Sequence, residues 1–331
     1  MILSNDSIVI NKYFEGTSKI INLSTEIGKL LGVVDSTYLR KPEAALRKEN
    51  RIKSIQSSLE IEGNTLSIDQ VTTLFNNKRV LGPAKDILEV QNAINVYSQL
   101  DCFDAFKLDS YLSAHKLLMN GLVGKPGQLR TKGVGIFKVD EVAHMAPPAW
   151  NVQHLMSLLF DYLKNGDDNL IIKSCVFHYE MEFIHPFMDG NGRMGRLWQT
   201  VILMNENPVF EFLPIEVEVR NTQQDYYKSL SISDKQGIST VFVEYMLEII
   251  LKSLKQLVTE QRSQLSDIER VEYFIENFKQ ENFVRKDYLN MFKDISSATA
   301  SRDLRKGVEE GFFAKKGDKS KTNYLVKKSV N

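Results

Sequence analysis

One short segment carries the residue types that transfer of a phosphate-bearing group requires. Residues 185–196 read His-Pro-Phe-Met-Asp-Gly-Asn-Gly-Arg-Met-Gly-Arg. A histidine accepts a proton near neutral pH, and a carboxylate beside a polyphosphate holds a divalent cation. Arginines three residues apart lie on one face of a helix and bind phosphate oxygens with paired N–H groups. The segment therefore predicts attack on a phosphate of a metal-bound nucleotide, with His185 as the proton acceptor and Asp189 as the metal ligand.

Two helices must position this segment. Apolar residues recur at helical spacing over 170–184, and Pro186 disfavours helix at His185, so the first helix is predicted to end there. The glycine-rich stretch 190–192 permits tight backbone angles, and helical periodicity resumes from Arg193. A helix N-terminus carries unpaired N–H groups and a partial positive charge, which favour a phosphate. A lone histidine at a helix end is more often structural, and a lone Gly-x-Gly is more often a turn, but here both accompany an acid and two arginines.

The whole chain predicts a mainly α fold. It has 331 residues, 43% hydrophobic and 25% charged, which is ordinary for a globular protein and suggests one large domain with an appendage or two domains. Helical periodicity recurs over 88–97, 108–118, 152–163 and 242–257. We expect an N-terminal helical segment over residues 1–100, a catalytic core over 101–260 and a separate module over 266–331.

Charge and composition exclude several function classes. The net charge is zero, so no global field attracts nucleic acid or an anionic membrane. The most apolar helical stretch, 241–251, contains two glutamates and is too short to span a bilayer. Cys102 and Cys175 lack the spacing of metal or redox pairs and are expected to be small buried side chains. The N-terminus has no signal-peptide pattern, so we expect a cytoplasmic protein with no membrane partner.

Residues 185–196 resemble the signature of the Fic family, H-P-F-x-D/E-G-N-G-R-x-x-R, at every fixed position. The resemblance implies a protein adenylyltransferase that moves AMP from ATP to a Ser, Thr or Tyr hydroxyl of a target protein. It implies an all-helical core with one small β-hairpin. It assigns His185 as the base and Asp189 as the ligand of Mg²⁺ or Mn²⁺. It assigns ATP binding to the rest of the signature: Gly190, Asn191 and Gly192 as an anion cradle, Arg193 and Arg196 as the phosphate grip, and Met194 and Gly195 between them.

Two further regions resemble parts of the nucleotide site. In the family a β-hairpin called the flap precedes the signature and aligns the target segment. Residues 127–130 and 142–148 resemble this flap, and residues 132–140 between them are rich in Gly and Val, although the sequence alone reads as an ordinary loop with short strands. Tyr226 and Tyr227 fall where the family places aromatic residues around the adenine, although such a pair is more often core packing. The resemblance therefore adds to the ATP-binding residues Val142, Ala143, His144, Met145, Tyr226 and Tyr227.

Ser58-Leu59-Glu60-Ile61-Glu62-Gly63 fits the family's inhibitory motif, S/T-x-x-x-E-G/N. Taken alone, this short motif is more typical of a solvated glutamate on a helix. Together with the signature it predicts that Glu62 forms a fork with Arg196 and occupies the place of the γ-phosphate. The inhibited and active forms would then be two populations that this pair biases.

The C-terminal module is predicted to contain helices over 268–278, 285–292 and 296–306 and strands over 311–317 and 322–326. This order resembles a winged helix-turn-helix, with residues 299–308 in the recognition position. Residues 281–331 contain twelve Lys or Arg and seven Asp or Glu. That excess is compatible with DNA contact through residues 266–331, and a protein-interaction or dimer module is the equal alternative.

Alternatives to AMP transfer stay open at this point. A related site could remove AMP from a target or use another nucleotide. The chain could instead be a DNA-binding regulator that acts through its basic module. The expected partners of the enzyme are a target protein, its own chain through self-modification, and a second copy in a homodimer.

Overall fold

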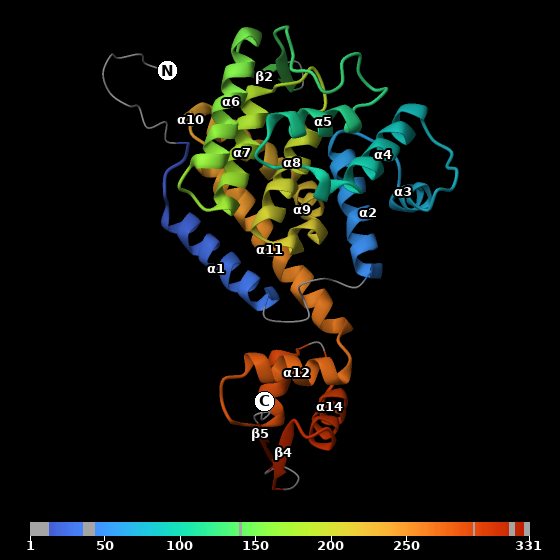
Figure 1. Ribbon diagram of the computed structural model, residues 1–331, viewed down its shortest axis with the longest axis vertical. Coiled ribbons are helices and arrows are strands. Elements are labelled where there is room, and N and C mark those ends of the chain that lie inside the picture. Colours follow the sequence, from blue (N-terminus) through green and yellow to red (C-terminus); the bar gives the residue numbers. More distant parts are fainter. Residues whose placement is uncertain (1–12, 36–43, 139–140, 294, 318–321, 328–331) are drawn as a thin grey trace. The chain divides into compact units, whose positions relative to one another are not determined.

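The computed structural model describes residues 13–35, 44–138, 141–293, 295–317 and 322–327. Contacts divide the chain into two compact units, the first made of residues 1–27 and 43–253 and the second of residues 28–42 and 254–331. Helices make up most of the described chain (Figure 1), which confirms the mainly α fold. Over the described ranges, no helix has both the length and the apolar composition of a membrane span.

The first unit is a bundle of helices. α7 packs between α6 and α8, and α5 contacts both α6 and α8 (Figure 1). α2 packs against α4 and α9. Two helices, α1 (Ser18–Asp35) and α11 (Thr240–Gln264), have residues in both units. The remaining helices of the first unit are α2 (Ala44–Ile61), α3 (Ile68–Phe75), α4 (Ala84–Tyr97), α5 (Leu108–Leu118), α6 (Ala149–Asn165), α7 (Leu170–Ile184), α8 (Asn191–Glu206), α9 (Ile215–Asn221) and α10 (Gln223–Gln236), with 3₁₀ turns at Leu100–Cys102 and Pro208–Phe212.

An aromatic cluster at the centre of this unit anchors the signature. The ring of Phe187 is fully buried and stacks on Tyr111 with ring centroids 5.4 Å apart and on His115 at 3.6 Å. Trp198 of α8 meets Tyr111 edge to face at 5.1 Å. Burying a large apolar side chain stabilises a fold by about 1.5–3 kcal/mol. The signature is therefore fixed from inside, because its third residue belongs to the core.

The predicted hairpin is present. β1 (Gly135–Lys138) pairs antiparallel with β2 (Glu141–Met145), with Gly135 opposite Met145. The register shifts between Ile136 and Phe137, which marks a bulge. The predicted ATP-binding residues Val142, Ala143, His144 and Met145 lie in β2, and their side chains lie outside the described part of the structure.

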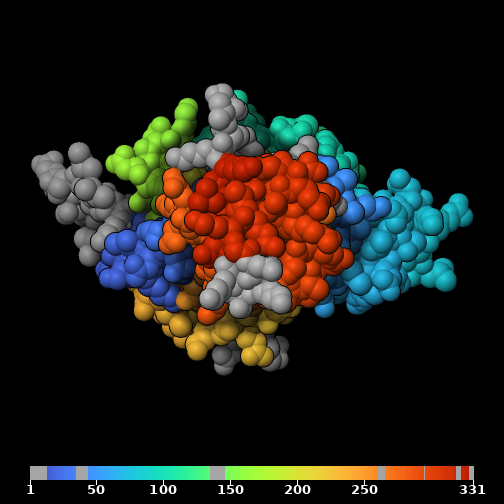
Figure 2. Space-filling model, turned by 90° about the horizontal axis from the view of Figure 1, so that it is seen from below, coloured from blue at the N-terminus to red at the C-terminus, as the bar shows by residue number. Residues whose placement is uncertain are grey.

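The second unit has its own core. In chain order it contains α12 (Asp267–Asn277), β3 (Asn282–Phe283), α13 (Arg285–Met291), α14 (Ser297–Glu309), β4 (Phe313–Lys316) and β5 (Asn323–Val326), and the sheet order is β3-β5-β4. The predicted helices and two longer strands are observed, whereas β3 has only two residues and was not predicted. Arg270 of α12 donates two hydrogen bonds, at 2.7 and 3.0 Å, to the buried carboxylate of Asp303 on α14. In the space-filling view the residues coloured orange-red to red, from α12 onward, are seen as one compact mass (Figure 2).

Two expectations need comment. Cys175 is buried as expected, but Cys102 is exposed, because it ends a short 3₁₀ turn at the surface. Residues 44–100 pack in the same unit as residues 101–253. The boundary at residue 100, between the predicted N-terminal segment and the predicted catalytic core, therefore does not separate two packed units. It stays a prediction about which residues carry the activity.

Candidate active site

His185 lies where α7 ends. Its N–H still donates to the Met181 carbonyl at 2.9 Å, but its backbone is left-handed, with φ 51° and ψ 60°. A non-glycine residue seldom adopts this conformation. Pro186 explains why the helix stops here, since a proline disfavours helical angles in the residue before it. His185 therefore lies at the turn between α7 and the glycine loop.

Side chains pin the backbone of that loop. Asn191 bonds both main-chain groups of Phe187: its Oδ1 accepts from the Phe187 N–H at 2.9 Å, and its Nδ2 donates to the Phe187 carbonyl at 3.0 Å. Asn191 was predicted to be part of the anion cradle, and in this structure its side chain holds the shape of the loop.

His115 of α5 holds the loop from the other side. Its Nδ1 accepts from the Gly127 N–H at 2.8 Å, so the proton of the neutral ring lies on Nε2, which donates to the Asp189 carbonyl at 3.1 Å. Burial lowers the pKa of His115 to about 4, more than the Asp189 carbonyl raises it. His115 is therefore neutral at physiological pH and acts as a fixed linker.

The N-terminus of α8 presents free donors. Gly190 has φ 86°, and a Cβ there would come within 2.7 Å of the Met119 sulfur, so only glycine fits. The first helical hydrogen bond runs from the Met194 N–H to the Gly190 carbonyl at 2.9 Å. The N–H groups of residues 191–193 consequently have no partner within the helix, which makes this end of α8 a place for an anion.

Arg196 is buried and faces Ser58 and Glu62. Its Nη2 donates to Glu62 Oε1 at 2.6 Å and to the Ser58 carbonyl at 3.0 Å, while its Nε donates to Ser58 Oγ at 3.0 Å. Burial opposes the charge of Arg196, yet the neighbouring Glu62 carboxylate raises its pKa above the ordinary value. The four-residue spacing of Ser58 and Glu62 places both on one guanidinium. The predicted two-bond fork with Glu62 is wrong in detail, since Ser58 takes the Nε donor.

Glu62 also lies against the end of α8. A Cβ on Gly192 would collide with the Glu62 carboxylate, so the two approach more closely than any other residue type at 192 would allow. Glu62 follows the last turn of α2, and 32% of its side chain is exposed. Its carboxylate therefore occupies the position at the helix N-terminus where an anionic ligand would be favoured.

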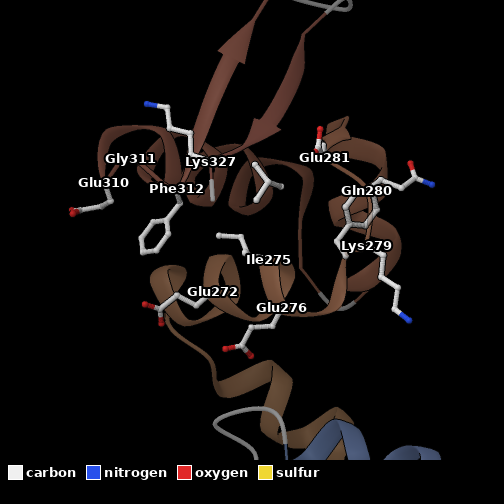
Figure 3. Close-up of a pocket in the computed structure, with 12 residues that line it drawn as sticks. Glu272, Ile275, Glu276, Lys279, Gln280, Glu281, Glu310, Gly311, Phe312 and Lys327 are labelled. Atoms are coloured by element: carbon white, nitrogen blue, oxygen red, sulfur yellow. The ribbon is translucent and has the colours of Figure 1, made fainter. Parts of the chain in front are cut away.

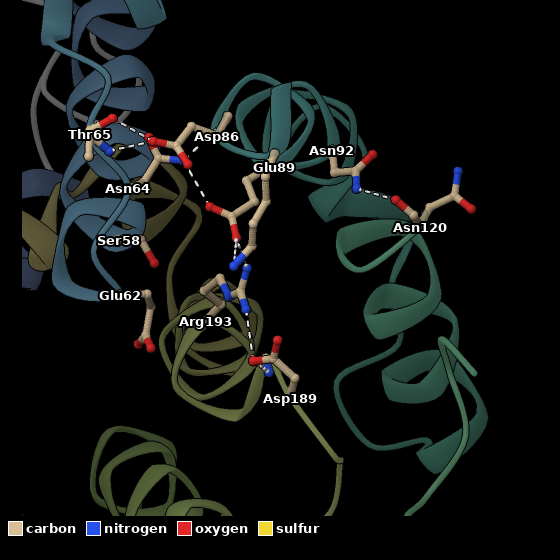
Figure 4. A network of polar contacts seen from close by, with 12 residues as sticks. Ser58, Glu62, Asn64, Thr65, Asp86, Glu89, Asn92, Asn120, Asp189 and Arg193 are labelled. Atoms are coloured by element: carbon tan, nitrogen blue, oxygen red, sulfur yellow. Dashed lines mark hydrogen bonds and ion pairs between the residues drawn. The ribbon is translucent and has the colours of Figure 1, made fainter. Parts of the chain in front are cut away.

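Arg193 belongs to a separate polar network (Figure 4). Its Nη1 donates to the buried Glu89 of α4 at 3.0 Å and its Nη2 to Asp189 Oδ1 at 3.0 Å. Asn64, two residues after Glu62, donates to the other Glu89 oxygen at 2.8 Å. Both carboxylate contacts use the terminal nitrogens of Arg193, so its predicted grip on phosphate falls to the remaining donors of the guanidinium.

Each arginine of the signature has one buried nitrogen without a hydrogen-bond acceptor among the described residues. In the described chain no acceptor lies within hydrogen-bond reach of Arg193 Nε or Arg196 Nη1. An unpaired buried donor is costly, so such groups usually mark a ligand, a water or strain. Both donors are on residues of the first turns of α8, and a bound phosphate is the ligand that would satisfy them.

Asp189 fits a metal ligand that shares its ion with a nucleotide. Its Oδ1 accepts from Arg193 and from the Gly190 N–H at 2.6 Å, and 54% of its side chain is exposed. Within the described ranges, no three or more His, Cys, Asp or Glu side chains form a metal-binding group. A single carboxylate suits Mg²⁺, which takes one or two protein oxygens and completes its shell with phosphate and water.

Three predicted contacts fall in the core. Tyr226 is 2% exposed and its hydroxyl lies 3.0 Å from His178 Nε2, so in this conformation its ring has no surface for an adenine. Tyr227 beside it is half-buried and remains the candidate. Met194 is fully buried, and a Cβ on Gly195 would come within 2.6 Å of the Met181 methyl group. Met194 and Gly195 therefore pack α8 onto α7 and present no side chain to a nucleotide.

Glu182 of α7 is a site neighbour that the sequence did not single out. A Cβ on Gly195 would come within 2.9 Å of its Oε1, and this oxygen has no hydrogen-bond partner among the described residues. Burial, and next the negative charge of Glu62, raises the pKa of Glu182 to about 8. At neutral pH it is largely protonated, so it can lie near Glu62 without repelling it.

Sequence reasoning also missed Glu89 and His115. Each is a polar residue inside an apolar helical stripe, and burial within such a stripe demands a partner. The pattern therefore predicts that each of these residues has a hydrogen-bond partner, but it does not identify the partner.

Comparisons with known proteins agree with this site. The Fic/DOC family model matches residues 105–203. The crystal structure of a Fic family protein from Desulfovibrio desulfuricans G20 is 38% identical, and the match covers 97% of this chain and 99% of that one with a TM-score of 0.73.

Curated relatives carry an activity in their names. Protein adenylyltransferase fic-1 of Caenorhabditis elegans is 26% identical over 285 residues, which is 77% of this chain and 54% of that protein. A probable protein adenylyltransferase of Aquifex aeolicus is 30% identical over 193 residues, covering 56% of this chain and 55% of that protein. The chain spans about half the length of the curated relatives it matches.

The raised pKa of Glu182 makes stability depend on pH. The folded protein holds the Glu182 proton up to a higher pH than the unfolded chain does. The contribution of Glu182 to stability is therefore greatest below the ordinary pKa of 4.5 and is lost as pH rises through about 8. We expect Glu182→Gln to leave the Tm unchanged at pH 5 and to raise it by several degrees at pH 9. Thermal unfolding at both pH values checks this, with the exposed Glu60→Gln as control; equal Tm differences at pH 5 and 9 would contradict the assignment.

Proposed function

Because the chain belongs to the Fic/DOC family, we propose that it is a protein adenylyltransferase that transfers AMP from ATP to a Ser, Thr or Tyr hydroxyl of a target protein. The observation that carries this proposal is the end of α8. At the N-terminus of α8 the N–H groups of residues 191–193 have no partner within the helix, and Arg193 Nε and Arg196 Nη1 have no acceptor within reach among the described residues. These donors would hold a polyphosphate, and His185 precedes them on the same loop as the proton acceptor.

In the proposed reaction the target hydroxyl attacks the α-phosphorus of ATP. His185 accepts the hydroxyl proton as the new oxygen–phosphorus bond forms. The bond between the α-phosphorus and the bridging oxygen breaks, and pyrophosphate leaves with the electron pair. Arg193, Arg196 and the N–H groups of residues 191–193 stabilise the negative charge that develops on the leaving group.

Asp189 is the residue that would hold a divalent cation, Mg²⁺ or Mn²⁺. Its half-exposed carboxylate lies at the start of the phosphate cradle, and Arg193 orients it. When bound, the ion neutralises charge on the phosphate oxygens. The chain's own contribution is to fix the carboxylate direction through the Gly190 N–H.

We further propose that Glu62 inhibits this reaction. Its carboxylate lies at the end of α8 and pairs with Arg196, so it has the charge and the place of a phosphate group. ATP that binds beside Glu62 would be misaligned for in-line attack, and misalignment alone slows a positioned reaction severely. Release of Glu62 from Arg196 is then the step that activates the enzyme.

Related chemistries use the same groups. Removal of AMP from a modified protein, or transfer from another nucleotide, would need the same cradle and the same proton acceptor. Comparing label transferred from ATP, GTP, UTP and CTP, and AMP released from a modified protein, separates these activities. We favour ATP because the named relatives are adenylyltransferases.

DNA binding through residues 266–331 is a second candidate function. The order of elements in this unit resembles that of a winged helix-turn-helix, and Arg302 and Arg305 are exposed on α14, which would hold the recognition position. The charge argument is weaker than residues 281–331 suggested, because residues 266–331 contain 14 Lys or Arg against 11 Asp or Glu.

One face of the same unit is unsuited to DNA. A groove of about 820 Å³ is lined by four glutamates and by the two lysines Lys279 and Lys327. Figure 3 shows these side chains around it. Like-charge repulsion keeps phosphate away from such a surface, so any DNA contact belongs to α14 and the strands. The glutamates that line the groove are Glu272, Glu276, Glu281 and Glu310.

Replacing His185 with Ala removes the proton acceptor but leaves the phosphate cradle. We expect AMP transfer to fall by at least about 100-fold, the lower end of general-base effects, with the affinity for ATP retained. Label from α-labelled ATP on protein and calorimetric ATP binding are the two measurements. Transfer at the wild-type rate would remove His185 from its assigned role.

Replacing Glu62 with Gly frees Arg196 and the end of α8. We expect self-modification by α-labelled ATP to rise at least about tenfold, the change that an ion pair of about 1.4 kcal/mol would make. Glu60→Gly is the matched control, since Glu60 lies on the same helix but pairs with Arg220 at the surface. No rise for Glu62→Gly, or an equal rise for Glu60→Gly, would argue against inhibition by Glu62.

The DNA candidate is tested on the full chain. If it holds, affinity for a duplex falls as salt rises, and Arg302→Gln with Arg305→Gln weakens binding, because lost phosphate contacts reduce counterion release. The control pair is Lys279→Gln with Lys327→Gln beside the acidic groove. Absence of binding at low salt removes this function.

A further inference from the structure

Arg130 connects the hairpin to the signature, and every acceptor of its hydrogen bonds is a backbone carbonyl. It lies between α5 and β1, and only 3% of it is exposed. Its Nε donates to the His185 carbonyl at 2.7 Å, and its Nη2 donates to the Ile184 carbonyl at 3.2 Å. Its own main-chain N–H donates to the Pro186 carbonyl at 2.9 Å. Three consecutive carbonyls at the end of α7 therefore point at one residue.

The same guanidinium holds both ends of the hairpin. Nη1 donates to the carbonyl of Lys132, three residues before β1, at 2.9 Å. Nη2 donates to the carbonyl of Pro147, two residues after β2, at 2.5 Å. The segment that enters the hairpin and the segment that leaves it are thus both bonded to the Arg130 guanidinium.

The physical fit of Arg130 at this point is specific. A buried cation is stable only where acceptors replace water, and the last carbonyls of a helix are unpaired and carry partial negative charge. Five N–H groups in a planar fork reach four carbonyls at once, which a lysine ammonium with three donors cannot do. The left-handed backbone of His185 needs such fixing, because it is unfavourable unless its surroundings hold it.

We propose that Arg130 is a positioning residue that sets the orientation of His185 and its place relative to the β1–β2 hairpin. This inference rests on the proposed function, in which His185 accepts a proton from a hydroxyl. Through Arg130, a shift of either hairpin stem moves the backbone of the proton acceptor. A displacement of about 1 Å in a reacting group costs about 100-fold in rate.

The test compares Arg130→Met and Arg130→Lys with Arg79→Met, the same substitution at an exposed site of the first unit. Hydrogen exchange of residues 131–148 and 184–190 reports on the connection without any need for activity. Label transfer at saturating ATP and the Kd for ATP report on positioning; both are measured in the Glu62→Gly background.

For Arg130→Met we expect faster exchange in both segments and transfer reduced about 100-fold, with the Kd for ATP unchanged. Arg130→Lys keeps the charge and three donors, so its exchange and its transfer rate should lie between those of Arg130→Met and of the unsubstituted protein. If Arg130→Met does not fold, Arg130→Lys alone provides the test. Arg79→Met should match the unsubstituted protein.

Two results overturn the proposal. One is unchanged exchange in both segments when Arg130 is replaced. The other is a loss of ATP affinity in proportion to the loss of transfer, which would mean that Arg130 only stabilises the fold. If the Glu62→Gly protein itself transfers no AMP, the proposed function fails, and the exchange measurement alone then supports or overturns the connection.

Discussion

The buried guanidinium of Arg196 is the constraint on which the site depends. A cation with 2% of its side chain exposed must have an anionic partner, and the end of α8 beside it also favours an anion. In this structure Glu62 meets both demands. A phosphate that replaced Glu62 would meet the same two demands, so under the proposed function Glu62 and ATP compete for one electrostatic position.

Around this position, rigidity comes mainly from side chains that bond the backbone. Asn191 holds Phe187, His115 holds Asp189, and Arg130 holds the turn at His185. The Phe187 ring fixes the same loop from the core. The loop is thus built before any ligand arrives, which is the condition for electrostatic stabilisation without reorganisation.

The sequence predicted the parts of the site whose cause is local. Pro186 predicted the end of α7, the glycines predicted the turn, and the short motif at 58–63 predicted the pairing of Glu62 with Arg196. The partners of Arg193 were not predictable, since Glu89 lies 104 residues away in a helix that looks merely apolar. The role of Arg130 was hidden for another reason: its acceptors are carbonyls, which every residue has. The burial of Tyr226 was not predictable, because an aromatic pair in a helix does not reveal which ring faces the core.

The most direct measurement of the central claim is the ratio of the Kd for ADP to the Kd for ATP, by calorimetry, in the wild type and in Glu62→Gly. If Glu62 occupies the place of the γ-phosphate, the wild type binds ATP no more tightly than ADP, and the variant gains affinity for ATP alone. The same ratio in both proteins would contradict competition between Glu62 and phosphate for Arg196.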